Sequence, residues 1–429
     1  MSGRKLGFGK QLAELHRWNG WIVLILAVTG LLLPWDVVRG WLEGHFRNPV
    51  KQLHIIVGIL SGVLIALYIP LMKRHLKQIR KRPKQKGNLG FMLVLLVGWF
   101  LSGIVLWQIR RFPPEWANGA LIVHDLLTWI GVPYIVYHSV TRMKWMKKPE
   151  RRAITQMDDA RSPDVHDPGA AAHAGLPASA ERAVDPVPLI NRRQFLKWSL
   201  GAALAVVAAP PFFRWLSTSA GAGLSGVPGG MKEVIDETNR MLPNPTPLPD
   251  SVNVIGGGAK GYFRVYSVTP LPSFDSSNWS FSIQGLVDKP ETWNWEQFLA
   301  LSRTVQVSDF HCVTGWSVYK NTWEGIPLSA LLKRAGVKAE AKYVKFYSGD
   351  GVYTDALTLE QADMDDVLVA LLHDGKPIHR DYGGPVRLIV PKMYAYKSVK
   401  WLDGIELIAQ EHIGYWEKRG YDNDAWVKT

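Results

Sequence analysis

Cys312, the single cysteine of the chain, is the first residue whose chemistry stands out. It lies within the segment Phe310-His311-Cys312-Val313-Thr314-Gly315-Trp316-Ser317. A disulfide framework, a CxxCH haem attachment site and a cysteine-ligated iron–sulfur cluster all need more than one cysteine in the chain, so they are excluded. A lone cysteine is either an inert core residue or the source of one thiolate for a metal centre or a reaction. The surrounding residues favour the thiolate.

Four histidines lie in or beside long apolar stretches, where a ligating side chain is a functional candidate. They are His16, His54, His124 and His138. The last two are 14 residues apart, which in a helix is about 21 Å of rise and nearly four whole turns. They therefore share one helix face at two depths, as two stacked haems require. One interfacial histidine is often only a polar residue among lipid headgroups, but four at matched depths favour ligation.

Four apolar stretches must position these histidines. They are Trp18–Val38, Leu53–Met72, Leu89–Ile109 and Leu121–Val140. Each approaches the ~20 residues of a bilayer-spanning helix. The N-terminus, Lys73–Lys86 and Arg142–Arg152 are strongly basic, whereas 39–51 and 110–120 are less so. The positive-inside rule therefore predicts that the N-terminus and both ends of the four-helix unit are cytoplasmic.

This topology pairs the histidines by depth: His16 with His138 near the inner face, and His54 with His124 near the outer face. Each pair would give a bis-imidazole iron suited to electron transfer rather than oxygen binding. The third helix contributes no histidine.

Two other histidines are set aside. His75 is a rival inner ligand, but it lies beside Arg74 and near Lys77, which predicts a solvated loop. His45 is expected to face solvent in an outer loop.

With these ligands, residues 10–145 resemble the four-helix cytochrome b subunits of membrane formate dehydrogenases and nickel–iron hydrogenases. The resemblance implies two b-type haems on the same helices and a quinone bound near the inner haem. We accordingly expect residues 1–146 to be a transmembrane di-haem domain embedded in membrane lipid.

Residues 147–190 are rich in Ala, Pro, Asp and Arg, and predict a flexible cytoplasmic linker. Next come Asn191-Arg192-Arg193-Gln194-Phe195-Leu196-Lys197 and an apolar run to Phe213. This segment, 191–216, resembles a twin-arginine export signal, although Asn191 departs from the usual Ser or Thr. The alternative is a fifth helix flanked by two arginines. Both interpretations send the rest of the chain to the outer face, the first by way of the twin-arginine translocation machinery.

The remaining sequence changes in texture. Residues 217–250 hold many Gly, Ser and Pro and predict a tether, while 251–429 predict a mixed α/β domain. Its expected strands include Tyr262–Val268, Trp279–Ile283, Tyr343–Tyr347 and Val386–Val390, with helices near 294–302 and 327–335.

Composition agrees with this multi-domain plan. The chain has 429 residues, of which 47% are hydrophobic and 19 are Trp, which argues against one soluble domain. The net charge of +13 could suit nucleic acid or the cytoplasmic loops of a membrane protein. The basic run Lys73–Lys86 lies between two apolar stretches, so we exclude nucleic acid as a partner.

The outer domain, about 250–429, resembles the sulfite-oxidase-like molybdopterin enzymes. Four ordered segments carry this resemblance: His311 to Ser317, Trp323 to Leu328, Gly383 to Pro391 and Tyr396 to Trp401. It implies that Cys312 binds molybdenum and that His311 and Arg387 contact the cofactor. It also implies that Lys397, Ser398 and Lys400 hold the cofactor phosphate, since two ammonium groups and a hydroxyl can bind a dianion.

Two departures bear on the substrate. Animal and plant sulfite oxidases follow their cysteine with an arginine-bearing segment, whereas Val313 to Trp316 contain no cation. A pocket without cations binds sulfite poorly, and the loop is closer to bacterial periplasmic methionine sulfoxide reductases. Tyr382 also stands where many relatives have a histidine before Gly-Gly-Pro, which leaves one contact open.

The sequence thus predicts a membrane-bound molybdenum oxidoreductase that passes electrons from quinol through two haems to a sulfoxide. One alternative is a dehydrogenase that oxidises sulfite or another small sulfur compound and feeds quinone. The other is a haem relay without enzyme activity.

Overall fold

The fold is taken from a computed structural model, which describes residues 7–33, 47–142, 192–219, 240–255, 258–261 and 263–428. These divide into two compact units, Met1–Leu127 with Trp215–Thr429, and Thr128–Arg214. The predicted linker, His45, Asn191 and most of the predicted tether lie outside the described residues.

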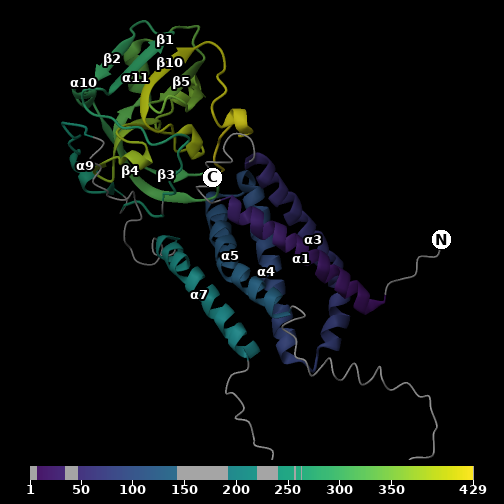
Figure 1. Ribbon diagram of the computed structural model, residues 1–429. Coiled ribbons are helices and arrows are strands. Elements are labelled where there is room, and N and C mark those ends of the chain that lie inside the picture. Colours follow the sequence, from purple (N-terminus) through teal and green to yellow (C-terminus); the bar gives the residue numbers. More distant parts are fainter. Residues whose placement is uncertain are drawn as a thin grey trace, which may run out of the picture. The chain divides into compact units, whose positions relative to one another are not determined.

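Four long helices account for the predicted membrane spans. They are α1 (Phe8–Leu32), α3 (Arg47–Gln78), α4 (Pro83–Trp107) and α5 (Pro114–Arg142) (Figure 1). Within the described part of the chain, these four helices are long and apolar enough to cross a membrane. Their exposed side chains include Trp18, Leu24, Ile56 and Val94. Apolar surface of this extent is suited to lipid rather than to water.

The helices run beyond the apolar stretches, and this corrects one prediction. The sequence predicts a solvated loop at His75, but the structure places His75 in the last turn of α3. Its Nδ1 lies 2.9 Å from the hydroxyl of Tyr68, two turns earlier on the same helix face. Hydropathy marks only the apolar part of a helix, and the backbone ladder of α3 continues through Arg74 and Lys77.

The second unit contains the end of α5 and most of α7 (Arg192–Ser219). The rings of Trp129 and Phe212 have centroids 6.4 Å apart, so the two helices pack together. Trp198, Val206 and Val207 of α7 are more than 70% exposed, at 77%, 72% and 73%. A helix therefore forms where the sequence predicts a signal-like apolar segment.

The C-terminal part of the first unit is a mixed α/β domain with two five-stranded sheets (Figure 1). One has the order β2-β1-β10-β5-β6 and is antiparallel except for the pair β1–β10; the other has the order β3-β4-β7-β8, with β9 on β7. The strands are β1 (Ser280–Gly285), β2 (Glu291–Asn294), β3 (Thr304–His311), β4 (Ser317–Pro327), β5 (Tyr343–Ser348), β6 (Thr354–Thr358), β7 (Leu368–His373), β8 (Lys376–Pro377), β9 (Arg387–Ile389) and β10 (Leu402–Ile408).

One short helix precedes these strands and three lie between them, and local sequence explains where two of these helices begin. They are α9 (Pro249–Val252), α10 (Trp295–Leu299), α11 (Leu328–Ala335) and α12 (Leu359–Ala362). Asn294 and Gln297 form a capping box at the start of α10, and Thr358 and Gln361 form another at α12. Each box satisfies amide groups that a helix start would leave unpaired. The predicted helices near 294–302 and 327–335 are confirmed as α10 and α11.

Three predicted strands are confirmed as β1, β5 and β9, but the one at Tyr262–Val268 is wrong. Residues 263–267 have no regular ladder. Phe263 is 3% exposed, and its ring lies 5.3 Å from that of Phe310 and 5.6 Å from that of His373. This segment is held by one buried aromatic anchor rather than by strand pairing, so its alternating apolar pattern is misleading.

The domain contains two buried clusters. The larger one packs aromatic side chains from β1 and α10, among them Phe281, Trp295 and Phe298. The smaller one, here called the aromatic floor, is formed by Ala259, Phe263, Phe310, Val318, Trp323, Leu368, Ala370, Ile378, Tyr382 and Ile389. The candidate site residues described next lie around this aromatic floor.

Candidate functional site

Cys312 lies at the tip of the hairpin between β3 and β4. The amide of Cys312 donates to the carbonyl of Trp316 and the amide of Gly315 donates to the carbonyl of Cys312, both at 2.9 Å. Gly315 has φ of +100°, a conformation that favours glycine. The turn therefore holds the cysteine in a partly exposed position on a fixed backbone. Sγ lies 3.1 Å from the Thr314 hydroxyl.

His311 ends β3 directly below this tip. Its Nδ1 lies 2.9 Å from the hydroxyl of Ser317, its register partner on β4. Burial lowers the pKa of His311, so the imidazole is neutral at neutral pH and offers one donor and one acceptor. It is thus placed as a neutral polar contact beside the cysteine.

Arg387 is a buried cation, 3% exposed, at the start of β9. Its Nη1 donates to the carbonyl of Tyr382 at 2.6 Å and its Nη2 to the carbonyl of Ser398 at 3.2 Å. Its guanidinium carbon lies 4.9 Å from the ring centre of Phe310. Burial lowers the pKa of Arg387 to about 9, and the described residues include no carboxylate that forms an ion pair with it.

Lys400 is a second cation of the same kind. Its ammonium donates to the carbonyl of Tyr266 and lies 4.3 Å from the ring centre of Trp401. Burial, and then the charge of Arg387, lower the pKa of Lys400 to about 7. Two neighbouring cations without a paired carboxylate among the described side chains are unfavourable unless an anion joins them.

Ser398 is also buried, and its hydrogen bonds fix the segment that leads to Lys400 against Arg387 and Val390. Its hydroxyl accepts from the amide of Val390 at 3.0 Å, and its carbonyl accepts from Arg387. The structure therefore brings His311, Arg387, Ser398 and Lys400 to one region beside the aromatic floor.

Lys397 is the exception among the predicted phosphate contacts. Its ammonium is 2.8 Å from Asp355, 2.7 Å from Glu417 and 2.9 Å from the amide oxygen of Asn423. The side chain is only 1% exposed, and its three hydrogens are used by these internal partners. The prediction of two lysines on one phosphate is therefore corrected. Lys397 joins β6 to the C-terminal segment, and Lys400 is the lysine that remains a candidate phosphate contact.

His379 is a candidate that the sequence prediction missed. Its Nδ1 accepts from the amide of Asp381 at 3.2 Å, so in the neutral ring Nε2 carries the hydrogen. This buried Nε2 has no partner in the described structure. The ring centroid lies 6.2 Å from that of Tyr382. The signal was present in the sequence, because Tyr382 replaces an expected histidine and His379 stands three residues before it.

The polar atoms around the aromatic floor fit an anionic, oxygen-rich cofactor. Buried donors without a partner in the described residues include Nε of Arg387, Nε1 of Trp323 and Nε2 of His379. Native proteins rarely leave buried donors unpaired, and pterin and phosphate oxygens would accept from them. The residues present therefore fit molybdopterin.

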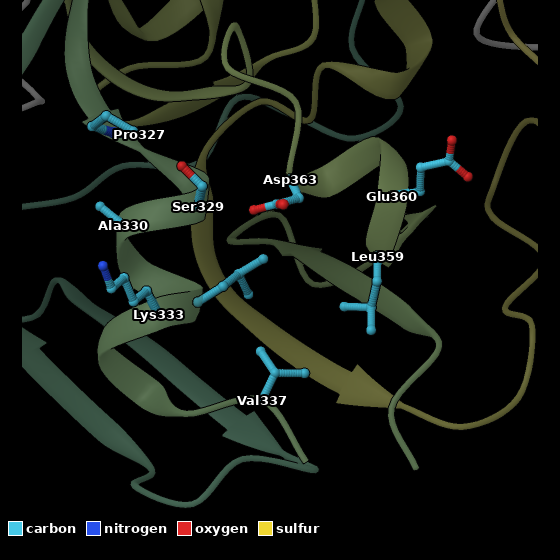
Figure 2. A pocket seen from close by; sticks show the side chains of 9 residues that line it. Pro327, Ser329, Ala330, Lys333, Val337, Leu359, Glu360 and Asp363 are labelled. Atoms are coloured by element: carbon cyan, nitrogen blue, oxygen red, sulfur yellow. The ribbon is translucent and has the colours of Figure 1, made fainter. Parts of the chain in front are cut away.

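A hollow of about 810 Å³ lies elsewhere in the domain, between α11 and α12 (Figure 2). Its polar lining of Ser329, Lys333, Glu360 and Asp363 has mixed charge and includes none of the predicted site residues. We do not assign it to the cofactor.

In the helical region, the structure brings His54 and His124 together. Their ring centroids are 6.4 Å apart and their planes are at 68°. Two imidazoles that share one metal ion at metal–nitrogen distances of about 2 Å have centroids roughly 6 Å apart, so this pair fits a bis-histidine iron. His16 and His138 lie in different units, and their pairing remains a prediction.

Comparisons with known proteins agree with this site. Residues 268–416 match the family described as the oxidoreductase molybdopterin binding domain. Residues 189–209 match the twin-arginine translocation signal sequence, which implies export across a membrane and supports the predicted export motif.

Three relatives are informative. The "uncharacterized oxidoreductase YuiH" of Bacillus subtilis is 34% identical over 44% of this chain and 91% of its own length. The protein-methionine-sulfoxide reductase catalytic subunit MsrP of Campylobacter jejuni is 29% identical over 35% of this chain and 56% of its own length. The MsrP of Pseudomonas syringae is 27% identical over 56% of this chain and 79% of its own length. The chain therefore belongs to the family of molybdopterin-binding oxidoreductases, and it is an oxidoreductase enzyme. The alternative of a relay without enzyme activity is thereby set aside.

Proposed function

We propose that this protein is a membrane-anchored molybdenum oxidoreductase that uses quinol to reduce a sulfoxide such as methionine sulfoxide. The quinol gives up two electrons and two protons and becomes a quinone. The sulfoxide loses its oxygen as water and becomes a sulfide. Residues 1–146 would be the di-haem domain, with the N-terminus in the cytoplasm, and residues 251–429 the catalytic domain on the extracytoplasmic face.

The catalytic domain would bind the cofactor through residues already described. Molybdenum, when bound, supplies the oxygen-atom and two-electron chemistry, while the protein controls access and charge. The thiolate of Cys312 would bind the metal at the hairpin tip. Arg387 and Lys400 would offset the phosphate charge, Ser398 and His311 would add polar contacts, and His379 would donate one more hydrogen bond.

The single observation that carries the membrane half of this proposal is the facing pair His54 and His124 on apolar helices. A ligand pair of this geometry suits an outer haem. His16 and His138 would bind the inner haem, close to the quinol. Electrons would then cross the bilayer between two low-spin irons toward the catalytic domain.

The substrate proposal depends on charge at the hairpin. Its residues Val313 to Trp316 bring no cation to Cys312. A doubly charged oxyanion such as sulfite needs charge-assisted contacts, whereas a neutral sulfoxide does not. The names of the C. jejuni and P. syringae relatives support the same substrate class. Oxidation of sulfite or another small sulfur compound, with electrons fed to quinone, is the alternative, because the same route serves both directions.

Haem spectra of the purified full-length protein in detergent test the proposal. We expect b-type absorption bands that show methionine sulfoxide reoxidising the reduced haems, and we expect sulfite to leave the oxidised haems oxidised. Metal analysis should find about one molybdenum per chain, as one thiolate ligand implies. Reduction of the haems by sulfite, together with no reoxidation by the sulfoxide, would show that electrons flow from the substrate to quinone instead. A preparation without b-type bands would refute the membrane half.

A further inference from the structure

The third long helix, α4, has no histidine, yet it contacts one of the four predicted ligands. The hydroxyl of Ser102 lies 2.9 Å from Nδ1 of His124. On α1, the hydroxyl of Thr29 lies 2.8 Å from Nδ1 of His54. Both hydroxyl residues are buried, at 6% exposure each. Two helices that supply no outer ligand therefore each supply one hydroxyl to an outer ligand.

The hydrogens of these hydroxyls are already committed. Thr29 Oγ1 is 2.7 Å from the carbonyl oxygen of Ile25, and Ser102 Oγ is 2.7 Å from that of Gly98. A carbonyl oxygen only accepts, so the single hydroxyl hydrogen must be donated to it. What each hydroxyl offers the imidazole is a lone pair.

The direction of these hydrogen bonds determines the tautomer of both imidazole rings. Because the hydroxyl accepts, Nδ1 of His54 and Nδ1 of His124 must carry hydrogens, and in each neutral ring the lone pair is on Nε2. We propose that Thr29 and Ser102 are positioning residues that make Nε2 the iron-binding nitrogen of the outer haem and set the 68° angle between the imidazole planes. This inference rests on the proposed function, because it assumes that the outer haem is bound.

A second observation points to the same two places. Each hydroxyl residue is followed by a glycine, giving Thr29-Gly30 and Ser102-Gly103. A Cβ on Gly30 would lie 3.2 Å from Cε1 of His54, and a Cβ on Gly103 would lie 3.8 Å from Cε1 of His124. A larger side chain at Gly30 would press on the edge of the imidazole. At Thr29-Gly30 the hydroxyl therefore binds the ring and the glycine leaves room for it, whereas a Cβ at Gly103 would only be in ordinary contact with His124.

The test uses Thr29→Val, which keeps the shape of the side chain, and Ser102→Ala, in the purified full-length protein. An imidazole that loses its hydrogen-bond acceptor is a weaker donor to ferric iron. We therefore expect outer-haem retention to fall about 10- to 100-fold, the outer-haem potential to rise, and its ferric EPR signal to shift. The inner haem should keep its potential and its signal.

Three further variants serve as controls. Thr29→Ser and Ser102→Thr keep the hydroxyl and should restore the outer-haem signal. Thr141→Ala removes a hydroxyl that donates to the carbonyl of Tyr137 at 2.8 Å and lies 3.3 Å from the carbonyl of His138, the same kind of intrahelical bond on α5, and should leave the outer haem unchanged.

Two results would overturn the inference while leaving the proposed function in place. One is a wild-type potential and EPR signal in both Thr29→Val and Ser102→Ala. The other is a loss in Thr29→Ser as large as that in Thr29→Val, which would show that keeping the hydroxyl at position 29 does not preserve the outer haem. A wild-type protein with no b-type haem would instead refute the proposed function, and this inference with it.

Discussion

The helical region and the α/β domain present their predicted redox ligands in opposite ways. His54 and His124 project from regular helices, and each ring is held by one hydroxyl on a neighbouring helix. Cys312 stands on a hairpin turn, and its region is completed by Arg387 and Lys400, more than 70 residues later. In the first case helical periodicity sets the geometry. In the second, the geometry comes from a sheet that joins distant segments.

The largest expected effect tests the hairpin side of this comparison. Cys312→Ala should lower sulfoxide reduction by more than about 100-fold, because the metal loses its thiolate, while haem content stays unchanged. Turnover assays and haem spectra on the same preparation measure both. Thr314→Val, which removes only the hydroxyl beside Sγ, is the matched control and should retain most activity. Persistent turnover in Cys312→Ala would remove the cysteine from its role.

On the helical side, His54→Ala should remove one of the two haems. Quinol-driven reduction should fall by more than about 100-fold, while reduction driven by a soluble dye should continue, because the dye supplies the catalytic domain directly. Quantified haem and paired assays with the two donors measure this. His75→Ala should keep both haems. If it loses the inner one, His75 and not His16 is the ligand.

Lys397→Met separates structural from cofactor-binding lysines. Losing this cation leaves Asp355 and Glu417 buried without compensation, which should cost about 3–5 kcal/mol in the free energy of unfolding. Lys392→Met is the control, because its ion pair with Asp366 is half-exposed and should be worth less than about 1 kcal/mol. Denaturant unfolding followed by tryptophan fluorescence gives both values. Equal small losses would return Lys397 to the candidate phosphate contacts.

The smallest effect is a pH dependence of cofactor retention. The pKa of Lys400 is lowered to about 7 in the folded chain, while an unfolded lysine titrates near 10.4. Between these values the unfolded chain binds more protons, so the apoprotein gains stability as pH rises. A phosphate favours the charged form, so affinity for the cofactor should fall as pH rises above about 7. Molybdenum retention measured from pH 6 to 9 tests this, and Lys400→Met should flatten the profile.

Sequence alone went further for the helices than for the domain. Apolar length was enough to place the predicted ligands His54 and His124 on spans that the structure contains as α3 and α5. The same pattern could not show Thr29 and Ser102, because a back-bonded hydroxyl leaves no periodic mark. In the domain, short motifs located Cys312, Arg387 and Lys400, but nothing in Tyr396 to Trp401 predicts that Lys397, and not Lys400, pairs with carboxylates of the protein. Burial and the position of Asp355, 42 residues earlier, decided that.

If Cys312 binds molybdenum as proposed, the single thiol of this chain reports how much of the protein carries the metal. An alkylating reagent has one sulfur to modify, at the partly exposed tip of the β3–β4 hairpin. Metal coordination would shield that sulfur, and the mass added per chain would then report the fraction of empty protein. The chain has no other cysteine that would be alkylated. The alkylated fraction can therefore be measured on intact membranes, before purification changes the proportion of metal-free protein.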